Sequence, residues 1–266
     1  VPNLPTDPSQ DTVINYVANK AKLVVKYVDE KGKDLIPAET TEGKVGDEYS
    51  TSGKVIPGHL LVRVEGEAKG KIGKDGSTVT YVYKPIGSWI PNIPGQPTNP
   101  IKYPNDPTDP TKPGTDLPLI PHVPGTTPVG PDGTTPLTPK DPSDPSKGYN
   151  PPPVPSDPTK DTPINYVKDG QKAIISFVDQ TDGNKELTKV VESGKSGEPI
   201  GTTNYAARLK ELTDKGYEVV NDEFAGPKNF DNDNKKDQQF VVTLRQGKDP
   251  ITDPAKLNSK VTRTIK

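Results

Sequence analysis

The sequence predicts a mostly β, α+β protein: two small modules in an elongated array, joined by a long Pro-rich extended segment. Three observations predict it. An internal repeat relates residues 4–29 to residues 154–179, and segments rich in β-branched and aromatic residues follow each copy. Residues 85–163, between the copies, contain 24 of the 33 prolines. Because only 29% of the 266 residues are apolar, one large core is not expected.

The internal repeat has a constant offset of 150 residues. LPTDPSQDTVINYVANKAKLVVKYVD (4–29) and VPSDPTKDTPINYVKDGQKAIISFVD (154–179) are identical at 12 of 26 positions. After a slip of one residue, GKVGDEYST (43–51) aligns with GKSGEPIGT (194–202). Chance explains this poorly, so the two modules are expected to share an ancestor.

The repeat and the change in composition divide the chain into five parts. They are a Pro-rich lead-in with an entering strand (1–20), a β module (21–86), a Pro-rich extended spacer that is partly docked (87–163), a second module with one helix (164–247), and the start of a further repeat (248–266). We call 21–86 the first module and 164–247 the second module.

In the first module, β-branched and aromatic residues predict strands at 23–29, 59–65 and 78–84. Within 78–84, Val79, Tyr81 and Tyr83 share one face, which is typical of a half-buried strand. No long helix is predicted here. A plain antiparallel sandwich is an alternative for this module.

The second module adds a helix to a similar set of strands, predicted at 173–179, 186–192, 217–221 and 239–245. Tyr205, Leu209 and Leu212 have helical spacing, Thr202 or Thr203 can cap the start, and Gly216 is suited to a left-handed C-terminal position. A helix crossing one face of a small mixed sheet, in the order ββαββ, is a β-grasp (ubiquitin-like) arrangement. We extend this fold class to both modules.

Prolines in the spacer disfavour helix and central strand, and they favour a semi-rigid polyproline II conformation. The spacer is not purely polar, so parts of it are expected to pack against a module. The apolar residues that predict this packing are Ile90, Ile93, Ile101, Leu117, Leu119, Ile120 and Val123. A role as a ligand of SH3 or WW domains is not favoured, since no basic-flanked PxxP unit repeats.

Composition excludes several classes of function. The net charge of −2 offers no basic stripe for nucleic acid, and no apolar run is long enough to cross a bilayer. The chain has no cysteine, and its two histidines, His59 and His122, have no nucleophile nearby in sequence. No glycine-rich phosphate loop is present. We therefore predict no catalytic, cofactor-binding or metal-ligating residues, no cofactor, and no enzyme activity; the ligand-binding residues are unknown from sequence.

Four local features admit a functional interpretation beside a structural one. The loop 231–237 could bind calcium through Asp231, Asp233 and Asp237, or its side chains could simply hydrogen-bond to the local backbone. Trp89 could stack on a sugar, but an anchor for the start of the spacer is the favoured interpretation. Tyr81 and Tyr83 are expected in the core before any glycan contact. An isopeptide bond between Lys26 and Asn15 cannot be tested from sequence.

Residues 25–87 resemble a MucBP (mucin-binding protein) domain almost end to end. The marks are the YVDE-x-G hairpin, the GKVGD turn, the IPG before HLLVRVE, and the strand TVTYVYK. The spacer and second module, from YPNDPTDPTKPG to FDNDNKKDQQFVVTL, resemble the companion repeat of Lactobacillus-type mucus adhesins. The tail LNSKVTRTIK (257–266) resembles the opening of a further repeat.

This resemblance implies a non-catalytic adhesion module of an extracellular protein of a Gram-positive bacterium. The implied partners are mucin glycans, other host glycoproteins or an immunoglobulin, bound by a monomeric repeat through multivalent weak contacts. Cell-wall attachment would be encoded outside this fragment, since no LPxTG-type motif is present. The alternative function is a structural stalk that projects other binding domains from the cell wall.

Overall fold

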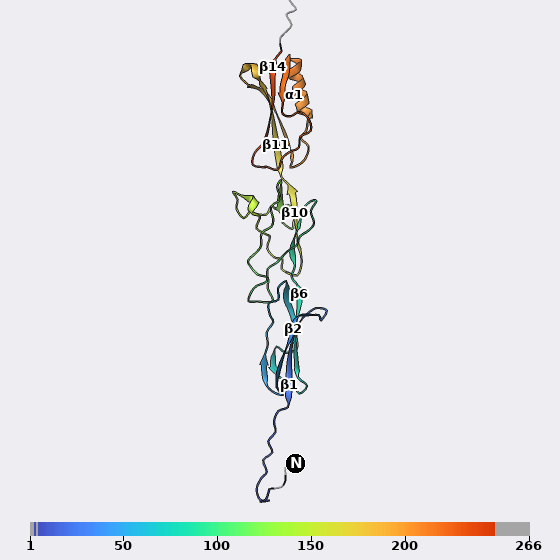
Figure 1. The fold of residues 1–266 in the computed structure, drawn as a ribbon, viewed down its shortest axis with the longest axis vertical. Coiled ribbons are helices and arrows are strands. Elements are labelled where there is room, and N and C mark those ends of the chain that lie inside the picture. Colours follow the sequence, from blue (N-terminus) through green and yellow to red (C-terminus); the bar gives the residue numbers. More distant parts are fainter. Residues whose placement is uncertain (1–2, 4, 248–266) are drawn as a thin grey trace, which may run out of the picture. The chain divides into compact units, whose positions relative to one another are not determined.

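The computed structural model describes residue 3 and residues 5–247, and Figure 1 labels the helix α1 and several of the strands. The chain divides into two compact units. Unit 1 consists of residues 1–120, 130–143 and 148–165, and it holds the first module and most of the Pro-rich segment. Unit 2 consists of residues 121–129, 144–147 and 166–266, and it holds the sheet of the second module. Each unit is described by itself.

The first module is a four-stranded sheet with the order β2-β1-β6-β4. Its strands are β1 (Lys20–Asp29), β2 (Asp34–Lys44), β4 (His59–Glu65) and β6 (Ser77–Pro85). The central pair, β1 and β6, is parallel, and both outer pairs are antiparallel. Two short strands, β3 (Glu48–Ser50) and β5 (Lys69–Lys71), form a separate antiparallel pair.

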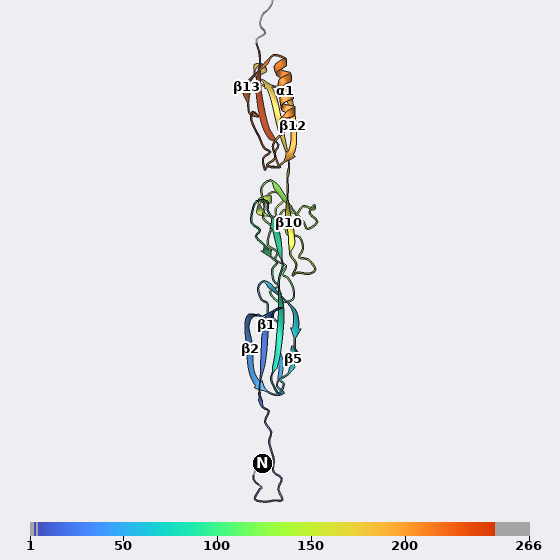
Figure 2. The same cartoon turned by 90° about the vertical axis from the view of Figure 1, so that its right-hand side faces the viewer.

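The second module repeats this topology as the sheet β12-β11-β14-β13. Its strands are β11 (Gly170–Asp179), β12 (Lys185–Lys195), β13 (Tyr217–Asp222) and β14 (Gln238–Gln246), and β11 is parallel to β14. The helix α1 (Thr203–Asp214) lies along one face of this sheet (Figures 1 and 2), and a short 3-10 helix, Gln180–Asp182, follows β11. The prediction of a mostly β protein is confirmed.

The helix ends close to the predicted limits, with one correction. Thr202 is the N-cap residue, but its side chain makes no capping hydrogen bond. At the other end, Gly216 has φ +91°, the left-handed conformation that the sequence predicts for this position. The strands predicted inside the two modules are all present, while β2 was not predicted. Most of its side chains are exposed, so it has no apolar alternation to detect.

Tyrosine hydroxyls in the core of the first module bond to an irregular segment that crosses the sheet. Tyr27 and Tyr81 stack there at 5.7 Å between ring centroids, and the Tyr81 hydroxyl lies 2.8 Å from Thr51 Oγ1. The Tyr83 hydroxyl donates to the Lys54 carbonyl (2.8 Å) and accepts from the Lys54 N–H (2.9 Å). These bonds hold an irregular segment, 51–54, across the sheet.

In the second module the matching positions are Phe177, Val242 and Leu244, which have no hydroxyl, as the pairing of β11 with β14 shows. The apolar face of α1 covers them: Tyr205, Leu209 and Leu212 pack into the core that contains Phe177, Phe224 and Leu244. An amphipathic helix satisfies its own backbone hydrogen bonds, so it needs no polar partner on the sheet.

Tyr83→Phe is expected to destabilise the first module by about 1–2 kcal/mol, because the backbone N–H and the backbone carbonyl of Lys54 both lose their hydrogen-bond partner. Tyr81→Phe, which removes one bond, is expected to cost about half as much. Hydrogen exchange of the β1 and β6 amides in each variant measures the two free energies. Equal exchange rates in wild type and Tyr83→Phe would contradict this role of the hydroxyl.

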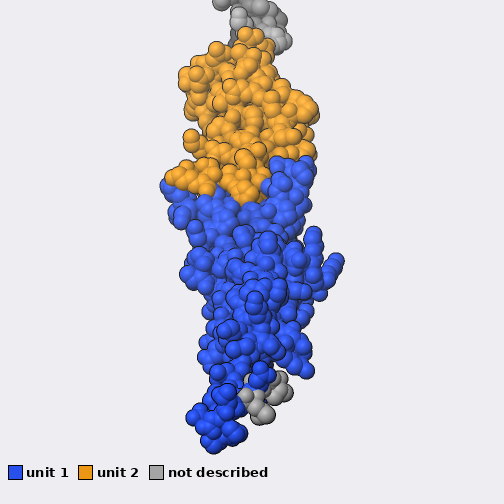
Figure 3. All heavy atoms as spheres, turned by 60° about the horizontal axis from the view of Figure 1, so that its bottom comes forward, with its two compact units in different colours: residues 1–120, 130–143, 148–165 blue, residues 121–129, 144–147, 166–266 orange. Residues whose placement is uncertain are grey.

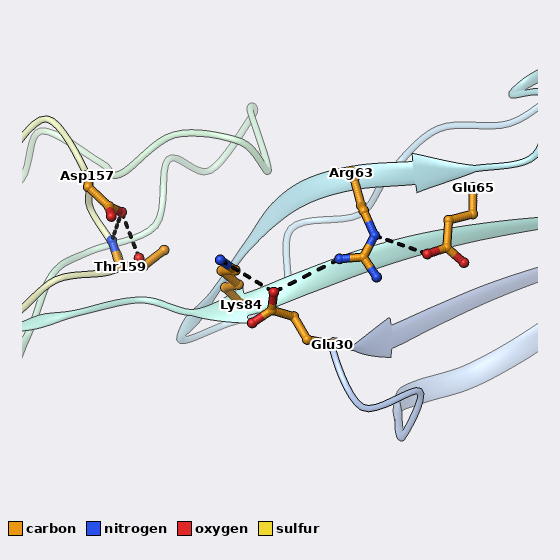
Figure 4. A network of polar contacts seen from close by, with 6 residues as sticks. All are labelled: Glu30, Arg63, Glu65, Lys84, Asp157 and Thr159. Carbon is orange, nitrogen blue, oxygen red and sulfur yellow. Dashed lines mark hydrogen bonds and ion pairs between the residues drawn. The ribbon is translucent and has the colours of Figure 1, made fainter.

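Surface ion pairs in the first module connect the turn after β1 with strands β4 and β6. Figure 4 shows Glu30 between Lys84 and Arg63, at N–O distances of 3.4 and 4.0 Å, with Arg63 also 3.0 Å from Glu65. All four side chains are about half exposed. Such pairs contribute little to stability, on the order of 0–1 kcal/mol each.

Within unit 1 the Pro-rich segment has a core of its own, which an extended spacer would not have. The strands involved are β7 (Ser88–Asn92), β8 (Ile101–Lys102) and the first part of β10 (Thr162–Lys168); β10 runs parallel to β7 and β8 antiparallel. Trp89 is fully buried; its ring meets Tyr103 edge-on at 4.5 Å, and its Nε1 donates to the Pro152 carbonyl (3.1 Å). Other buried members are Ile120, Tyr149 and Ile164.

This segment is also joined to the first module inside unit 1, which is blue in Figure 3. The Asn105 side chain accepts from the Gly58 N–H (2.8 Å) and donates to the His59 carbonyl (2.7 Å), and the Leu61 N–H donates to the Pro110 carbonyl (2.8 Å). Two other parts of the Pro-rich segment, β9 (Thr126–Val129) and the 3-10 turn Pro145–Lys147, belong to unit 2.

The lead-in differs from its prediction. Its described residues before Lys20 form no strand, although the equivalent residues at an offset of 150 form β10. The physical reason is that β10 has β7 as a partner, whereas no strand of the described chain pairs with residues 12–17. The predicted further repeat, 248–266, lies outside the described residues.

Candidate functional site

The two modules share a distinctive end, where the first hairpin of each sheet finishes. In the first module Ala21 on β1 pairs with Gly43 on β2; in the second module Gln171 on β11 pairs with Gly194 on β12. Each glycine begins the GK-x-G turn that the internal repeat contains. Side chains at these glycines would collide with neighbours, since a Cβ would lie 2.9 Å from Ile72 in one and 2.3 Å from the Phe230 ring in the other.

The turn is held by the same hydrogen bonds in both modules. An acidic side chain accepts from the turn lysine: Asp47 from Lys44 N–H (2.8 Å), and Glu198 from Lys195 N–H (3.1 Å). The second turn glycine and the acidic residue bond to the backbone of a buried apolar residue in the loop before the last strand. The N–H to carbonyl pairs are Gly46 to Ile72, Ile72 to Asp47, Gly197 to Phe230 and Phe230 to Glu198, all 2.8–3.0 Å.

Each module has a groove beside the start of its parallel strand pair. The groove of the first module has a volume of about 430 Å³ and is lined by Lys20, Ala21, Lys22, Val24 and residues 74–78. The groove of the second module has a volume of about 440 Å³ and is lined by residues 170–172, Ser193, Gly194, Asn234, Lys236 and Asp237. We call these grooves A and B.

The charges in the two grooves are similar. Groove A contains Lys20, Lys22 and Lys74 beside Asp75, and groove B contains Lys172 and Lys236 beside Asp237. A hydrogen bond from Lys22 to Glu42, with the two groups 2.9 Å apart, raises the pKa of the lysine. Each groove therefore combines ammonium groups with backbone, hydroxyl or amide groups, a set that can bind oxygen-rich and acidic ligands.

Groove B has an additional support from the Pro-rich segment within unit 2. The Asp169 N–H donates to the Gly125 carbonyl (2.9 Å), and the Asp169 carboxylate accepts from Thr127 Oγ1 (2.6 Å) and from Asn234 Nδ2 (3.2 Å). Asn234 lines the groove. The position of a groove residue thus depends on a hydrogen bond to the residue that precedes β11.

The aromatic candidates from sequence are structural. Trp89 has no exposed surface, so it cannot stack on a sugar. The partners of its ring and Nε1, Tyr103 and Pro152, lie in the Pro-rich segment, whereas the predicted anchor would join the spacer to the first module. Tyr81 and Tyr83 lie in the core, as predicted. His59 is the first residue of β4, and its Nδ1 lies 3.2 Å from the Pro57 carbonyl.

The loop 231–237 uses its carboxylates locally. Asp231 accepts from the Asp233 N–H (3.1 Å), and Asp233 accepts from the Lys235 N–H (3.0 Å). Across residues 3 and 5–247, no group of three His, Cys, Asp or Glu side chains is placed to hold a metal ion. The geometry gives the calcium interpretation no support. Lys26 and Asn15, the isopeptide candidates, are both exposed.

A third hollow of about 440 Å³ lies in unit 1, among Pro131, Pro136, Leu137 and Pro151–Pro153. It is largely apolar and has no lysine or arginine in its lining. Its one carboxylate, Asp132, already accepts from the hydroxyl and N–H of Thr135, and these bonds lower its pKa. Because it has no counterpart in the second module's sheet, we rank grooves A and B above it as the candidate site.

The GK-x-G alignment is visible in the sequence, but the grooves beside this turn are not. The signal was present, since both copies keep the glycines, the turn lysine and an acidic residue. What it could not show is that the loop before the last strand, 72–78 or 230–237, folds against this turn. Those loops differ in length and composition, so no repeat is visible in them.

Comparisons with known proteins match the two modules separately. A mucin binding domain model matches residues 171–246, and a MucBP domain model matches residues 22–84. These ranges cover β11–β14 and β1–β6, with both grooves at their edge.

Relatives match short parts of much longer proteins. Internalin J of Listeria monocytogenes is 40% identical over 81 residues, which are 29% of this chain and 9% of the relative. Muramidase-released protein of Streptococcus suis is 41% identical over 92 residues, 30% of this chain and 7% of the relative. The chain therefore spans less than a tenth of the length of these relatives. A solved type 2 repeat of the mucus binding protein MUB from Lactobacillus reuteri is 28% identical, with a TM-score of 0.26, over 29% of this chain and 41% of that one.

In the described part of the chain, no helix combines the length and apolar character needed to cross a membrane.

Proposed function

The two modules of this chain are MucBP-type repeats, and from that premise we propose that the chain is a non-catalytic adhesion module which binds mucin glycans or other host glycoproteins. The observation that carries the proposal is the pair of grooves A and B, which two copies of one ancestral module form at the same place. We further propose that the modules are of the β-grasp class. The sheet order with a parallel central pair supports this assignment.

The chemistry of the grooves favours acidic oligosaccharides as ligands. A sialic acid carboxylate or a sugar sulfate can accept charge-assisted hydrogen bonds from the lysines, and neutral hydroxyls can bond to the amide and hydroxyl groups beside them. Neither groove is enclosed, so each single contact is weak. Two grooves on one chain, and more on a chain of several repeats, raise the effective concentration of the second contact.

The experiment compares binding of lysine variants to immobilised mucin. Lys20→Ala with Lys74→Ala alters groove A, and Lys172→Ala with Lys236→Ala alters groove B. Loss of a charge-assisted hydrogen bond costs about 1.5–3 kcal/mol, so either pair is expected to weaken binding by about tenfold or more, and all four together by more than either pair. A matched control is Lys84→Ala with Lys210→Ala, which removes the same charge from lysines outside the grooves.

Four outcomes separate this proposal from its alternatives. Loss of binding after sialidase or sulfatase treatment of the mucin supports acidic glycans as ligands. Binding that survives complete deglycosylation indicates recognition of host protein, such as an immunoglobulin. Equal binding by the groove variants and the control contradicts the assignment of the grooves, and no binding by the wild-type chain favours a structural stalk. Exposure of the protein on the surface of a Gram-positive cell is part of the proposal, and antibody labelling of intact cells tests it.

A further inference from the structure

Residues 7–17 of the lead-in repeat residues 157–167, in which Thr162 and Ile164 are buried and residues 162–165 pair with the Pro-rich segment of unit 1. We call the first the free copy and the second the docked copy. In the docked copy, Thr162–Asn165 pair with Trp89–Asn92 of β7 as parallel strands. Ile164 has no exposed surface.

Polar contacts also fix the docked copy. The Asp161 carboxylate accepts from the Ser88 N–H (2.8 Å), and the Lys160 carbonyl accepts from the Tyr103 hydroxyl (3.0 Å). That hydroxyl is also 2.6 Å from Thr162 Oγ1. Asn165 accepts from Asn92 Nδ2 (2.9 Å).

The free copy keeps every side chain that makes these contacts. Asp11, Thr12, Ile14 and Asn15 stand at the positions of Asp161, Thr162, Ile164 and Asn165. Lys160 is replaced by Gln10, but it contributes only its backbone carbonyl to this contact. In the free copy the apolar side chains are instead exposed: Val13 by 78%, Ile14 by 54%, Tyr16 by 92% and Val17 by 86%.

The free copy also has the local turn of the docked copy. The Asp7 carboxylate accepts from the N–H (2.9 Å) and hydroxyl (2.6 Å) of Ser9, as Asp157 accepts from Thr159 at 3.1 and 2.6 Å (Figure 4). The Gln10 N–H donates to the Asp7 carbonyl (3.1 Å), and the Lys160 N–H donates to the Asp157 carbonyl at the same distance. The turn at residues 7–10 is therefore formed before any partner is present, which lowers the entropy cost of docking the residues that follow it.

An apolar segment with unpaired backbone groups is a template for a strand partner. We propose that residues 7–17 are a docking strand, and that its occupant is a second copy of the Pro-rich segment equivalent to residues 86–154, carried by another repeat of this kind placed before Pro5 in the same chain. The docked copy indicates that the occupant and the strand belong to the same chain. Trp89 Nε1 bonds to Pro152 and the Gly87 N–H to Pro158, so the occupant and the strand it holds are continuous around residues 152–158.

The close approach at Gly87 shows how closely the occupant fits. A Cβ at this position would lie 2.3 Å from the Lys160 carbonyl oxygen, and backbone atoms cannot move aside as a side-chain tip can. The free copy offers the same carbonyl at Gln10. A strand built on SWIPN, preceded by glycine, is thus the specific partner that the free copy fits.

The test is a tandem chain in which residues 20–154 are duplicated in front of Pro5 of the full chain, so that the natural junction between residues 154 and 155 is reproduced. Hydrogen exchange with mass spectrometry resolves the two copies, because DTVINYVANK and DTPINYVKDG differ in mass. In the tandem chain the amides of residues 12–17 are expected to exchange at least about 100-fold more slowly than in the original chain, at rates comparable to those of residues 162–167.

Two variants of the tandem chain complete the test. Ile14→Ala is expected to return the amides of residues 12–17 to fast exchange, and Gly87→Val in the added copy alone is expected to do the same. Val17→Ala is the matched control, since its equivalent Val167 is 45% exposed. If residues 12–17 exchange as fast in the tandem chain as in the original, or if Ile14→Ala leaves slow exchange intact, the proposal is wrong.

Discussion

Ile164→Ala is expected to destabilise the folded Pro-rich segment of unit 1 by about 2–5 kcal/mol. Ile164 is fully buried on β10, beside the strand that carries Trp89. Removing its side chain leaves a cavity in a small core with few other apolar members, so little of the loss can be recovered by repacking. A loss of this size is a large fraction of the stability of a small domain.

Trp89 provides the measurement, because it is the single tryptophan of the chain. Its emission is expected to shift to longer wavelength at a lower urea concentration in Ile164→Ala than in wild type. The matched control is Ile14→Ala, the same change at the equivalent position of the repeat. Ile14 is 54% exposed, so this variant is expected to change stability by less than about 0.5 kcal/mol.

An equal urea midpoint for Ile164→Ala and wild type would mean that the Pro-rich segment has no cooperative core. Such a result would instead support the extended polyproline spacer that the composition of the segment predicts. A large effect of Ile14→Ala in the unextended chain would contradict the exposure of the lead-in.

Phe177→Ala is expected to destabilise the second module by about 3–5 kcal/mol. Phe177 is fully buried on β11; it stacks on Tyr205 of α1 at 6.1 Å between ring centroids. Tyr205 in turn meets Phe224 edge-on at 4.8 Å. Truncating Phe177 therefore removes apolar contacts from the sheet and from the helix together, and α1 has few other buried side chains that hold it in place.

Hydrogen exchange of the β11 and β14 amides measures this loss, and far-UV circular dichroism follows the helix. Val191→Ala is the control: Val191 is on β12 of the same sheet but is 50% exposed, so a change below about 0.5 kcal/mol is expected. Unchanged exchange in Phe177→Ala would show that the sheet does not depend on the packing of α1.

The sequence predicts the local structure correctly where the type and spacing of neighbouring residues decide it. The strands 59–65 and 78–84 were located to within a residue at each end, because both are rich in apolar and β-branched or aromatic residues and lie next to turn residues. The helix was predicted from Tyr205, Leu209 and Leu212, which do face the core. The prediction failed at β2, whose polar side chains face solvent on an edge strand, and at the N-cap, where Thr202 satisfies no backbone group with its hydroxyl.

The candidate site illustrates a different limit. The GK-x-G turn is legible in the repeat, yet groove A needs Lys74 and groove B needs Lys236, from loops with no sequence likeness. Only the pairing of Ile72 and Phe230 with the turn brings those lysines to the same place. Contacts between segments some 30 residues apart depend on the path of the chain, which periodicity does not encode.

By itself the sequence determined the repeat, the mostly β composition, the helix of the second module and the absence of cysteine chemistry, because these follow from residue type and local spacing. The tertiary structure alone decided the state of each INYV segment. Ile14 and Ile164 occupy identical local sequences, yet one is exposed and the other has no exposed surface. The physical reason is that burial requires a partner: a strand with apolar side chains and unpaired backbone groups becomes a core strand only where another strand lies beside it.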